Sequence, residues 1–445
     1  MVITGGEFGF IDRVRQRIGT GGKGVALGIG DDAAILCPPP GKLLAACDML
    51  VEGVHFRKEY IRPWQLGWKA LAVNISDIAA MGGVPLFALV SIGLADWVDD
   101  TYIEGIYEGM LDIADRFGVD LVGGDTVSSP KAMVINMTIL GSTDSPVTRS
   151  GAKPGHLVAV TGYLGRSAAG LAYLQKMSNE QGIPWKHSRD AQSEGTPSLQ
   201  SGAQPRVRAG VQPGARPRVQ PRLQAGVQPE TQPGFQRGAH LELQPGVQQE
   251  SQEKPTGGHR ETRLEEERWI QDTQAKPSQT VAERGTAPED WESDATWLDE
   301  LIKAHLEPMP RVCEGRALAS TGVVSAMMDI SDGLAGEAHH IARESKVGVA
   351  LREDAVPIGY STLLAARCLE SDPLKWALSG GEDFELVFTF PPESTDRVRD
   401  ALSNAGGSMY IVGHITPETE GVVLVGSDGA KRSLPYEGYN HFRRI

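Results

Sequence analysis

The sequence predicts a chain that mixes strands and helices in two ordered stretches, which a long disordered segment separates. Short apolar runs alternate with longer helical patterns, and Gly-rich turns stand between them. The composition then changes abruptly between Ser178 and Thr296. With 445 residues, the chain is long enough for two or three domains with sizeable cores.

The composition excludes several classes of protein. A formal net charge of −14 argues against a nucleic-acid partner, which would require a basic face. We expect no membrane partner, because no run of about eighteen apolar residues occurs. The first residues lack the pattern of a signal peptide. The widely spaced cysteines favour a reduced compartment over disulfides or zinc, so we expect a cytoplasmic protein; they are Cys37, Cys47, Cys313 and Cys368.

The strongest predicted element before the change in composition is a helix over residues 63–81. Pro63 suits a first helical turn, Gly82 supplies the stop, and the sequence between them is apolar almost all round, which predicts burial. Residues 1–60 are predicted as short strands and turns, with a strand over 42–47 that ends at Asp48. Further elements are expected at 87–94, from Asp99 or Asp100 to about Phe117, and at 120–122, 133–141, 156–161 and 167–177.

Residues 178–296 are predicted to be disordered. They contain 12 of the 28 prolines and irregular partial repeats rich in Gln, Pro and Gly, without hydrophobic periodicity. So few apolar residues cannot offset the entropy of ordering the chain. Only 263–270 could form a helical patch. Order is expected to resume with helices at 297–304, at 334–345 and after Pro392, and strands at 347–351, 386–390 and 409–412.

The motif Gly28-Ile29-Gly30-Asp31-Asp32 places adjacent carboxylates between apolar residues. Such a pair is tolerable beside a divalent cation, although a tight surface turn explains the same residues. The spacing imitates a dinucleotide fingerprint, but the aspartates would repel a pyrophosphate, so we reject that reading. A Walker A motif does not occur, because neither Gly-Lys pair precedes Ser or Thr.

Carboxylates recur next to several segments whose apolar sequences predict burial. This recurrence favours metal binding as their role over a single surface turn. A buried Asp77 without a partner would be costly. Oxygen ligands without nearby His or Cys favour several magnesium ions, which usually arrive with phosphates, so we expect ATP-type phosphoryl transfer. No side chain is marked as a covalent nucleophile. The carboxylates are Asp31, Asp32, Asp48, Asp77, Asp125, Asp329 and Asp332.

Two further candidates remain open from the residues alone. The loop around Arg149 offers a cation and small polar residues, which suits a phosphate but equally a solvated basic turn. His55 follows a strand end and could face a ligand, yet a lone histidine is more often a satisfied loop residue.

Taken together, the motifs resemble the thiamine-monophosphate kinase family, which belongs to the superfamily of aminoimidazole ribonucleotide synthetase. The resemblance covers nearly all of residues 1–177 and 297–445, in order. The motifs are GIGDDAAIL, DMLVEGVHF, KALAVNISDIAAMGGVP, GGDT, TRSGAKPG, MDISDGL, LSGGEDFEL and GYNHF.

This resemblance implies an α+β fold of two domains, with an N-terminal mixed sheet and a C-terminal α/β domain. The ATP and magnesium domain would be 1–150 and the C-terminal domain 151–177 with 297–445, interrupted by the disordered insertion 178–296. The implied reaction moves the ATP γ-phosphate to thiamine monophosphate, giving thiamine diphosphate and ADP. The implied assembly is a homodimer whose N-terminal sheets meet.

The resemblance also implies roles for individual residues. Magnesium ligands would be Asp32, Asp48, Asp77, Asp125, Asp329 and Asp332. ATP would contact Gly124, Asp125, Arg149 and Ser331, and the thiamine phosphate would contact His55, Glu382 and Tyr439. Cys47 stands where the family commonly has a hydroxyl residue, so a metal contact there is lost or limited to the backbone.

Two alternatives differ from this interpretation. A sister enzyme of the superfamily could act on a different small phosphorylated substrate, although those relatives that depend on a terminal cysteine are disfavoured by the cysteine positions. The chain could instead be an interaction scaffold around a decayed kinase. The survival of all six aligned carboxylates counts against the scaffold.

Overall fold

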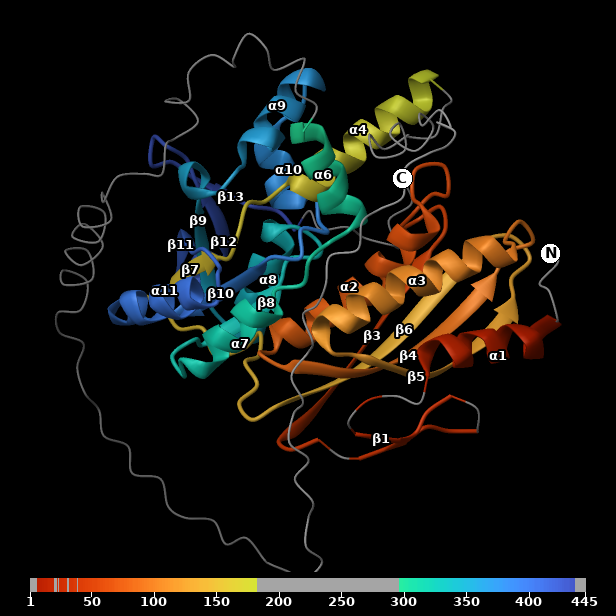
Figure 1. Cartoon of the computed structure of the whole chain (residues 1–445). Helices are drawn as coiled ribbons and strands as arrows, with labels where there is room; N and C mark the ends of the chain where they lie inside the picture. Colours follow the sequence, from red (N-terminus) through yellow and green to blue (C-terminus); the bar gives the residue numbers. More distant parts are fainter. Residues whose placement is uncertain are drawn as a thin grey trace, which may run out of the picture. The chain divides into compact units, whose positions relative to one another are not determined.

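The computed structural model describes residues 6–19, 22, 24–29, 32–37, 39–181 and 296–436. Within them, two larger sheets and their helices belong to one compact unit (Figure 1). The prediction of disorder over 178–296 is wrong at both ends, because residues 178–181 belong to the helix Arg166–Gln181 and residue 296 begins the helix Thr296–Leu306. The remainder, 182–295, lies outside the described residues. The helical patch at 263–270 and the closing GYNHF motif with Tyr439 also lie outside them.

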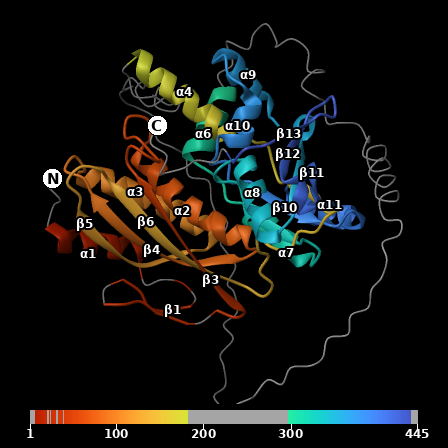
Figure 2. The same ribbon diagram turned by 180° about the vertical axis from the view of Figure 1, so that it is seen from behind.

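The N-terminal part is a four-stranded sheet in the order β3-β6-β4-β5. All its neighbours are antiparallel except β4 and β5, which are parallel. Figure 2 shows these strands side by side. The elements are α1 (Gly6–Ile18), β1 (Val25–Leu27), β2 (Ile35–Leu36), β3 (Lys42–Val51), α2 (Pro63–Ala80), β4 (Val84–Leu94), α3 (Asp100–Phe117), β5 (Asp120–Ser128) and β6 (Val134–Thr143).

Helices α2 and α3 pack on this sheet and on each other, as the apolar pattern predicts. Helix α2 is buried along nearly its whole length. The two helices meet at glycines, since a Cβ at Gly67 would lie 1.8 Å from the Ile106 carbonyl oxygen, and one at Gly109 would lie 1.8 Å from that of Trp64. Helix α3 is capped by Asp99, which accepts from the Tyr102 amide, and ends at Gly118 in the left-handed conformation. Both predicted ends of α3 are confirmed.

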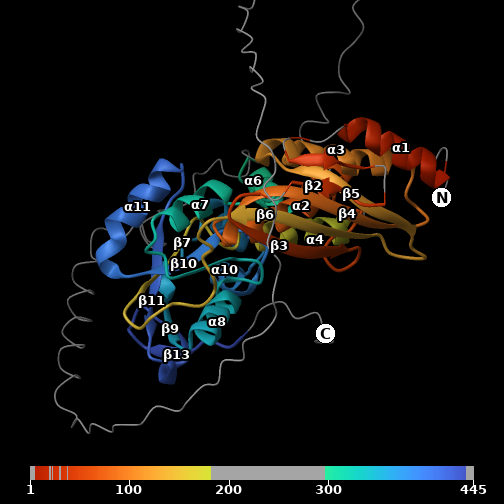
Figure 3. The ribbon, with the colours of Figure 1, turned by 90° about the horizontal axis from the view of Figure 1, so that it is seen from below.

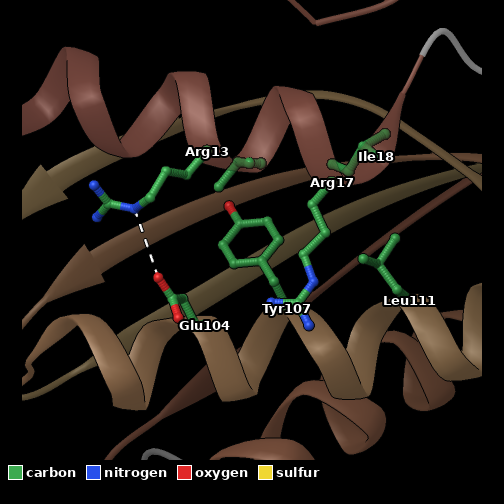
Figure 4. A pocket seen from close by; sticks show the side chains of 7 residues that line it. Arg13, Arg17, Ile18, Glu104, Tyr107 and Leu111 are labelled. Carbon is green, nitrogen blue, oxygen red and sulfur yellow. Dashed lines mark ion pairs between the residues drawn. The ribbon is translucent and has the colours of Figure 1, made fainter.

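The prediction for residues 1–60 is wrong in two places. Residues 6–18 form the helix α1, which lies along α3 (Figure 4). Arg13 contacts Asp100 at 2.7 Å and Glu104 at 3.6 Å. Val14 and Ile18 of this helix pack against the core. Strand β3 also runs past Asp48 to Val51, because its antiparallel pairing with β6 continues over ten residues.

The C-terminal part is a seven-stranded sheet in the order β13-β12-β9-β11-β7-β10-β8, in which only the β9–β12 pair is parallel. Helices α7 and α11 lie on one side of it and α8 on the other (Figure 3). Its strands are β7 (Leu157–Val160), β8 (Ala326–Asp329), β9 (Gly348–Arg352), β10 (Leu386–Phe390), β11 (Tyr410–Thr416), β12 (Val422–Val425) and β13 (Lys431–Ser433). The helices are α4 (Arg166–Gln181), α6 (Thr296–Leu306), α7 (Val312–Ser320), α8 (Leu334–Ser345), α9 (Tyr360–Cys368), α10 (Pro373–Ser379) and α11 (Thr395–Asn404).

Helix α2 also joins the two sheets. The Trp68 indole nitrogen donates to the Pro308 carbonyl oxygen at 2.9 Å, and the Ser76 hydroxyl donates to Asp329 at the end of β8 at 2.7 Å. The most buried helix of the N-terminal part therefore carries its polar residues toward the C-terminal part. Among the helices of the described ranges, none combines the length and apolar character of a membrane span.

Candidate active site

Carboxylates from three elements converge beside α2. Asp48 lies on β3, Asp77 on α2 and Asp329 at the end of β8. The Asn74 side chain, one turn before Asp77, accepts from the Asp48 backbone amide at 3.0 Å and so ties β3 to α2. Ser76 ties α2 to Asp329. Neighbouring residues of a single helix thus hold the two strands that carry the other carboxylates.

These carboxylates repel one another in a poorly solvated place. Burial, and then the charges of Asp329 and Asp48, raise the pKa of Asp77 to about 8, while Arg149 opposes the shift. Burial likewise raises the pKa of Asp48. It also raises the pKa of Asp329, against the hydrogen bond from Ser76. A divalent cation would relieve this repulsion, and carboxylate oxygens are the ligands that magnesium prefers. The donor set therefore fits the predicted metal.

The carboxylates of Asp48, Asp77 and Asp329 do not form a closed metal centre. Within the described ranges, no group of three or more His, Cys, Asp or Glu side chains stands close enough to hold a metal ion. The cluster instead borders an open pocket of about 530 Å³. Magnesium usually retains waters and takes only one or two protein carboxylates together with phosphates, so an open arrangement suits it.

The pocket joins the carboxylates to the predicted phosphate loop. Asp77 and Asp329 line it together with Thr148, Arg149 and Ser150. The loop is fixed to β8, because the Met327 amide donates to the Thr148 carbonyl oxygen at 2.9 Å. The remaining lining residues are Leu44, Ala45, Ala46, Ile78, Ala80, Met81, Met327, Met328 and Glu344. The Arg149 cation and the clustered carboxylates of Asp77 and Asp329 thus face one cavity, which suits a metal-bound polyphosphate.

The structure separates Asp125 from this cluster. The rows of paired residues run from Asp48 through Met137 and Val90 to Gly124, so β3 and β5 stand roughly 14 Å apart. Asp125 is exposed, and its carboxylate accepts from the Thr126 amide at 2.9 Å. A Cβ at Gly124 would lie 1.8 Å from the Val90 carbonyl oxygen, so glycine is required there.

Two other predicted metal residues occupy different positions. Asp32 is exposed between β1 and β2. The exposed Cys47 side chain points to the sheet face opposite Asp48, where its sulfur lies 3.3 Å from Asn136 and 3.6 Å from Thr138. Any role of Cys47 at the carboxylate cluster would therefore fall to its backbone.

Asp332 and Ser331 belong to the turn between β8 and α8, where Glu337 was missed by the sequence reasoning. The buried Glu337 carboxylate accepts from the amides of Ser331 at 3.2 Å and Asp332 at 3.0 Å. Burial, with added repulsion from Asp329 and Asp332, raises its pKa to about 8. An acidic residue in the first turn of a helix is common, so its place in the sequence carries no sign of this role.

The predicted acceptor residues come from two loops. The His55 ring nitrogen Nδ1 accepts from the Val51 amide at 3.1 Å, which fixes the ring beside the end of β3. Glu382 follows α10, and its carboxylate lies 3.1 Å from Lys69 Nζ on α2 and 3.2 Å from His305 Nδ1 on α6. Burial acts to raise the pKa of Glu382, but Lys69 and His305 outweigh it and hold that pKa well below its usual range.

The residues after Glu382 anchor the same loop. Asp383 accepts from the amides of Gly165 at 2.6 Å and Ser167 at 3.2 Å, at the start of α4. Glu385 is completely buried and contacts Arg311 at 2.5 Å and Arg166 at 3.0 Å. Ion pairs and backbone donors thus hold the GGED motif on both sides.

Comparison with known proteins identifies the fold. The AIR synthase related N-terminal domain model matches residues 30–143, and the corresponding C-terminal domain model matches residues 282–426. The chain therefore carries both domains of an AIR synthase related protein. Thiamine-monophosphate kinase from Escherichia coli O157:H7 is 30% identical over 438 residues, which cover 98% of each chain. The Bacillus subtilis enzyme is 30% identical over 422 residues and 94% of each chain. The chain belongs to the thiamine-monophosphate kinase family.

Solved structures give the same result. Thiamine-monophosphate kinase from Stenotrophomonas maltophilia K279a superposes with a TM-score of 0.60 at 25% identity, covering 96% of this chain and 98% of the other. The complex described as AaThiL with AMPPCP and TMP gives a TM-score of 0.56 at 26% identity, over 98% and 97% of the two chains. The hydrogenase maturation protein HypE of E. coli shares only the fold, with a TM-score of 0.56 at 15% identity.

Proposed function

We propose that this chain transfers the γ-phosphoryl group of ATP to thiamine monophosphate and releases thiamine diphosphate and ADP. The 30% identity to curated thiamine-monophosphate kinases over nearly the whole chain carries this proposal. It gains support from the relative solved with AMPPCP and TMP. A cavity bordered by Asp77, Asp329 and Arg149 offers this chemistry a place.

Magnesium would be held by the carboxylate cluster of Asp48, Asp77 and Asp329, joined by Asp332, Asp32 and Asp125 where the bound nucleotide brings them within reach. When bound, magnesium neutralises the charge of the phosphates and keeps the transferred group in line. Asp77 and Asp329 would supply oxygen ligands, and a bound cation would relieve the repulsion between them.

The nucleotide would be held by the chain itself from two sides. Arg149 donates to phosphate oxygens, and Ser331, Gly124 and Asp125 contact the remainder of ATP. At the other end, His55, Glu382 and Tyr439 hold the thiamine phosphate. No described His, Cys or Ser stands out as a nucleophile activated by a paired base, so we propose direct transfer with inversion at phosphorus.

We further propose a homodimer in which the open faces of the N-terminal sheets meet. On this face, large apolar side chains of β3 are exposed to solvent: Leu43 is 59% exposed and Met49 is 50% exposed. A subunit that remains monomeric would normally carry polar residues there. Light scattering measures the assembly directly.

We propose a cytoplasmic location, which suits the four free cysteines. The N-terminal domain, 1–150, would then supply both the dimer contact and most metal ligands.

A coupled assay of ADP release tests the proposed reaction, with thiamine monophosphate offered beside a panel of other small phosphorylated acceptors. We expect magnesium-dependent turnover on thiamine monophosphate. Turnover on a different acceptor, and none on thiamine monophosphate, would establish the alternative of a sister enzyme with another substrate.

A further inference from the structure

Lys69 is a buried cation that the proposed reaction does not use. Its side chain is 0% exposed, in the middle of α2. The ammonium nitrogen lies 3.1 Å from both carboxylate oxygens of Glu382. A buried ammonium without a counterion is strongly destabilising, so this pairing requires Glu382 to remain an anion.

Glu382, in contrast, is only partly covered. Its side chain keeps 27% of its exposure, although Lys69 and His305 both contact it. The backbone around it leaves little freedom, since the Glu382 amide donates to the Ser331 carbonyl oxygen at 2.7 Å. A Cβ at the preceding Gly381 would lie 2.5 Å from that same oxygen. The carboxylate is therefore fixed by the buried charge on one side and remains accessible on the other.

The neighbours of Glu382 indicate which chemical group it contacts. Ser331 belongs to the turn proposed to contact ATP, so Glu382 lies where the acceptor part of the site adjoins the nucleotide part. Tyr60 comes from the loop between His55 and α2. Burial raises the pKa of Tyr60, Arg57 opposes the shift, and the charges of Glu59 and Glu382 add to it. An anionic carboxylate repels a phosphate and attracts a cationic or N–H-bearing ring.

We propose that Lys69 is a positioning residue that holds Glu382 as the contact for the amino-substituted or cationic heteroaromatic ring system of the acceptor. This inference rests on the proposed function, because the acceptor is a phosphorylated molecule of that class. Lys69 touches neither substrate and acts only through Glu382. Its removal should therefore weaken acceptor binding and leave the phosphoryl-transfer step alone.

Lys69→Met tests this role, because methionine keeps the length and loses the charge. We expect the KM for thiamine monophosphate to rise about tenfold or more, while kcat and the KM for ATP change less than about twofold. Lys69→Arg keeps the charge in a different shape and should give a smaller rise in KM. Glu382→Gln should raise the same KM, and the double variant Lys69→Met/Glu382→Gln should be no worse than Glu382→Gln alone.

Gln65→Met is the matched control. Gln65 lies one turn before Lys69, is buried like it, and donates to Glu307, the residue directly after α6, at 3.0 Å. This variant loosens the same contact between α2 and α6 without touching Glu382, so the melting temperature should fall with no change in the acceptor KM. Equal acceptor KM values for Lys69→Met and Gln65→Met would overturn the positioning role.

The outcomes separate the two proposals. Wild-type turnover on thiamine monophosphate with an unchanged KM in Lys69→Met refutes the positioning role alone. A wild-type chain without such turnover refutes the proposed function, and the acceptor contact with it. If Lys69→Met does not fold, the double variant, which leaves no unpaired buried charge, replaces it, and an unchanged acceptor KM there refutes the contact.

Discussion

Helix α2 meets buried charge in opposite ways at its C-terminal end and in its middle. Near its C-terminal end, Asp77 stands with Asp48 and Asp329, and burial, reinforced by their like charges, raises the pKa of Asp77 to about 8. In its middle, Lys69 meets Glu382 at 3.1 Å, and opposite charges hold the pKa of Glu382 well below its usual range. The first group needs a cation from outside the chain, whereas the second is complete. The uncompensated carboxylates therefore indicate a site for a metal ion. In the compensated pair, the buried lysine instead holds Glu382 in position.

This contrast predicts the largest effect at Asp77. Asp77→Asn keeps the size of the side chain and removes one metal-binding charge, so turnover should fall by about a thousandfold or more, measured by ADP release. Without magnesium, the same variant should melt at a higher temperature, because one repelling charge is gone.

Asp396→Asn is the control for this swap, since Asp396 is 93% exposed and should tolerate it without change in either measurement. Near-normal turnover of Asp77→Asn at limiting magnesium would contradict the metal role. A sharp loss of melting temperature would indicate a structural aspartate instead.

A compensated pair should show the reverse pattern, with stability lost and chemistry kept. In Arg311→Met, Glu385 retains only Arg166 and the Thr161 hydroxyl as partners for a completely buried carboxylate. We expect the free energy of unfolding to fall by about 3 kcal/mol, with kcat of the folded fraction nearly unchanged. Urea titration measures the first and ADP release the second. A selective loss of kcat would place Arg311 in the reaction.

The acid–base behaviour should distinguish the clusters as well. The folded pKa of Asp77, about 8, exceeds its unfolded value of 3.8, so the folded state binds more protons between these limits. Stability of the magnesium-free protein should therefore fall as the pH rises from about 4 to 8. Saturating magnesium should flatten this slope, as should Asp77→Asn. Thermal unfolding across this range, with and without magnesium, is the measurement, and a parallel slope in all three samples would contradict the assignment.

Much of this arrangement is predictable from local sequence. The helix over 63–81 is confirmed as α2 (Pro63–Ala80), and the strand at 386–390 is confirmed as β10. Both have strong apolar patterns bounded by Gly or Pro. Helix α1 was missed, although Ile11, Val14 and Ile18 stand at helical spacing; its place beside the distant α3 involves ion pairs that the local pattern does not show. The two-domain AIR synthase related fold inferred from the motifs is confirmed by both domain models.

The site is less predictable than the fold, because it depends on distance in space. The motifs predict the same metal-binding role for Asp77, Asp329 and Asp125. Asp77 and Asp329 line one pocket, whereas Asp125 lies on β5, at the opposite edge of the sheet from β3. Lys69 opens the motif KALAVNISDIAAMGGVP, but nothing in that motif assigns it a role, and Glu337 lies outside the motifs. Each is significant only through a partner that the fold supplies, Glu382 for the lysine and the turn at Ser331 and Asp332 for the glutamate.

The smallest effect is expected where charges pair at the surface, between α1 and α3. Arg17 contacts Glu108, but their side chains are 39% and 51% exposed, so water solvates both charges well without the pair. Figure 4 shows Arg17 beside Tyr107 in the pocket between these helices. Methionine can keep the apolar part of this packing, so Arg17→Met should cost less than about 1 kcal/mol of unfolding free energy, and less still at high salt. Turnover should not change. Urea titration at low and high salt, with Arg399→Met as a second surface pair, measures this. A loss of unfolding free energy as large as that of Arg311→Met would show that the Arg17–Glu108 pair stabilises the fold as strongly as a buried ion pair. Solvent exposure would then not distinguish stabilising ion pairs from weak ones in this molecule.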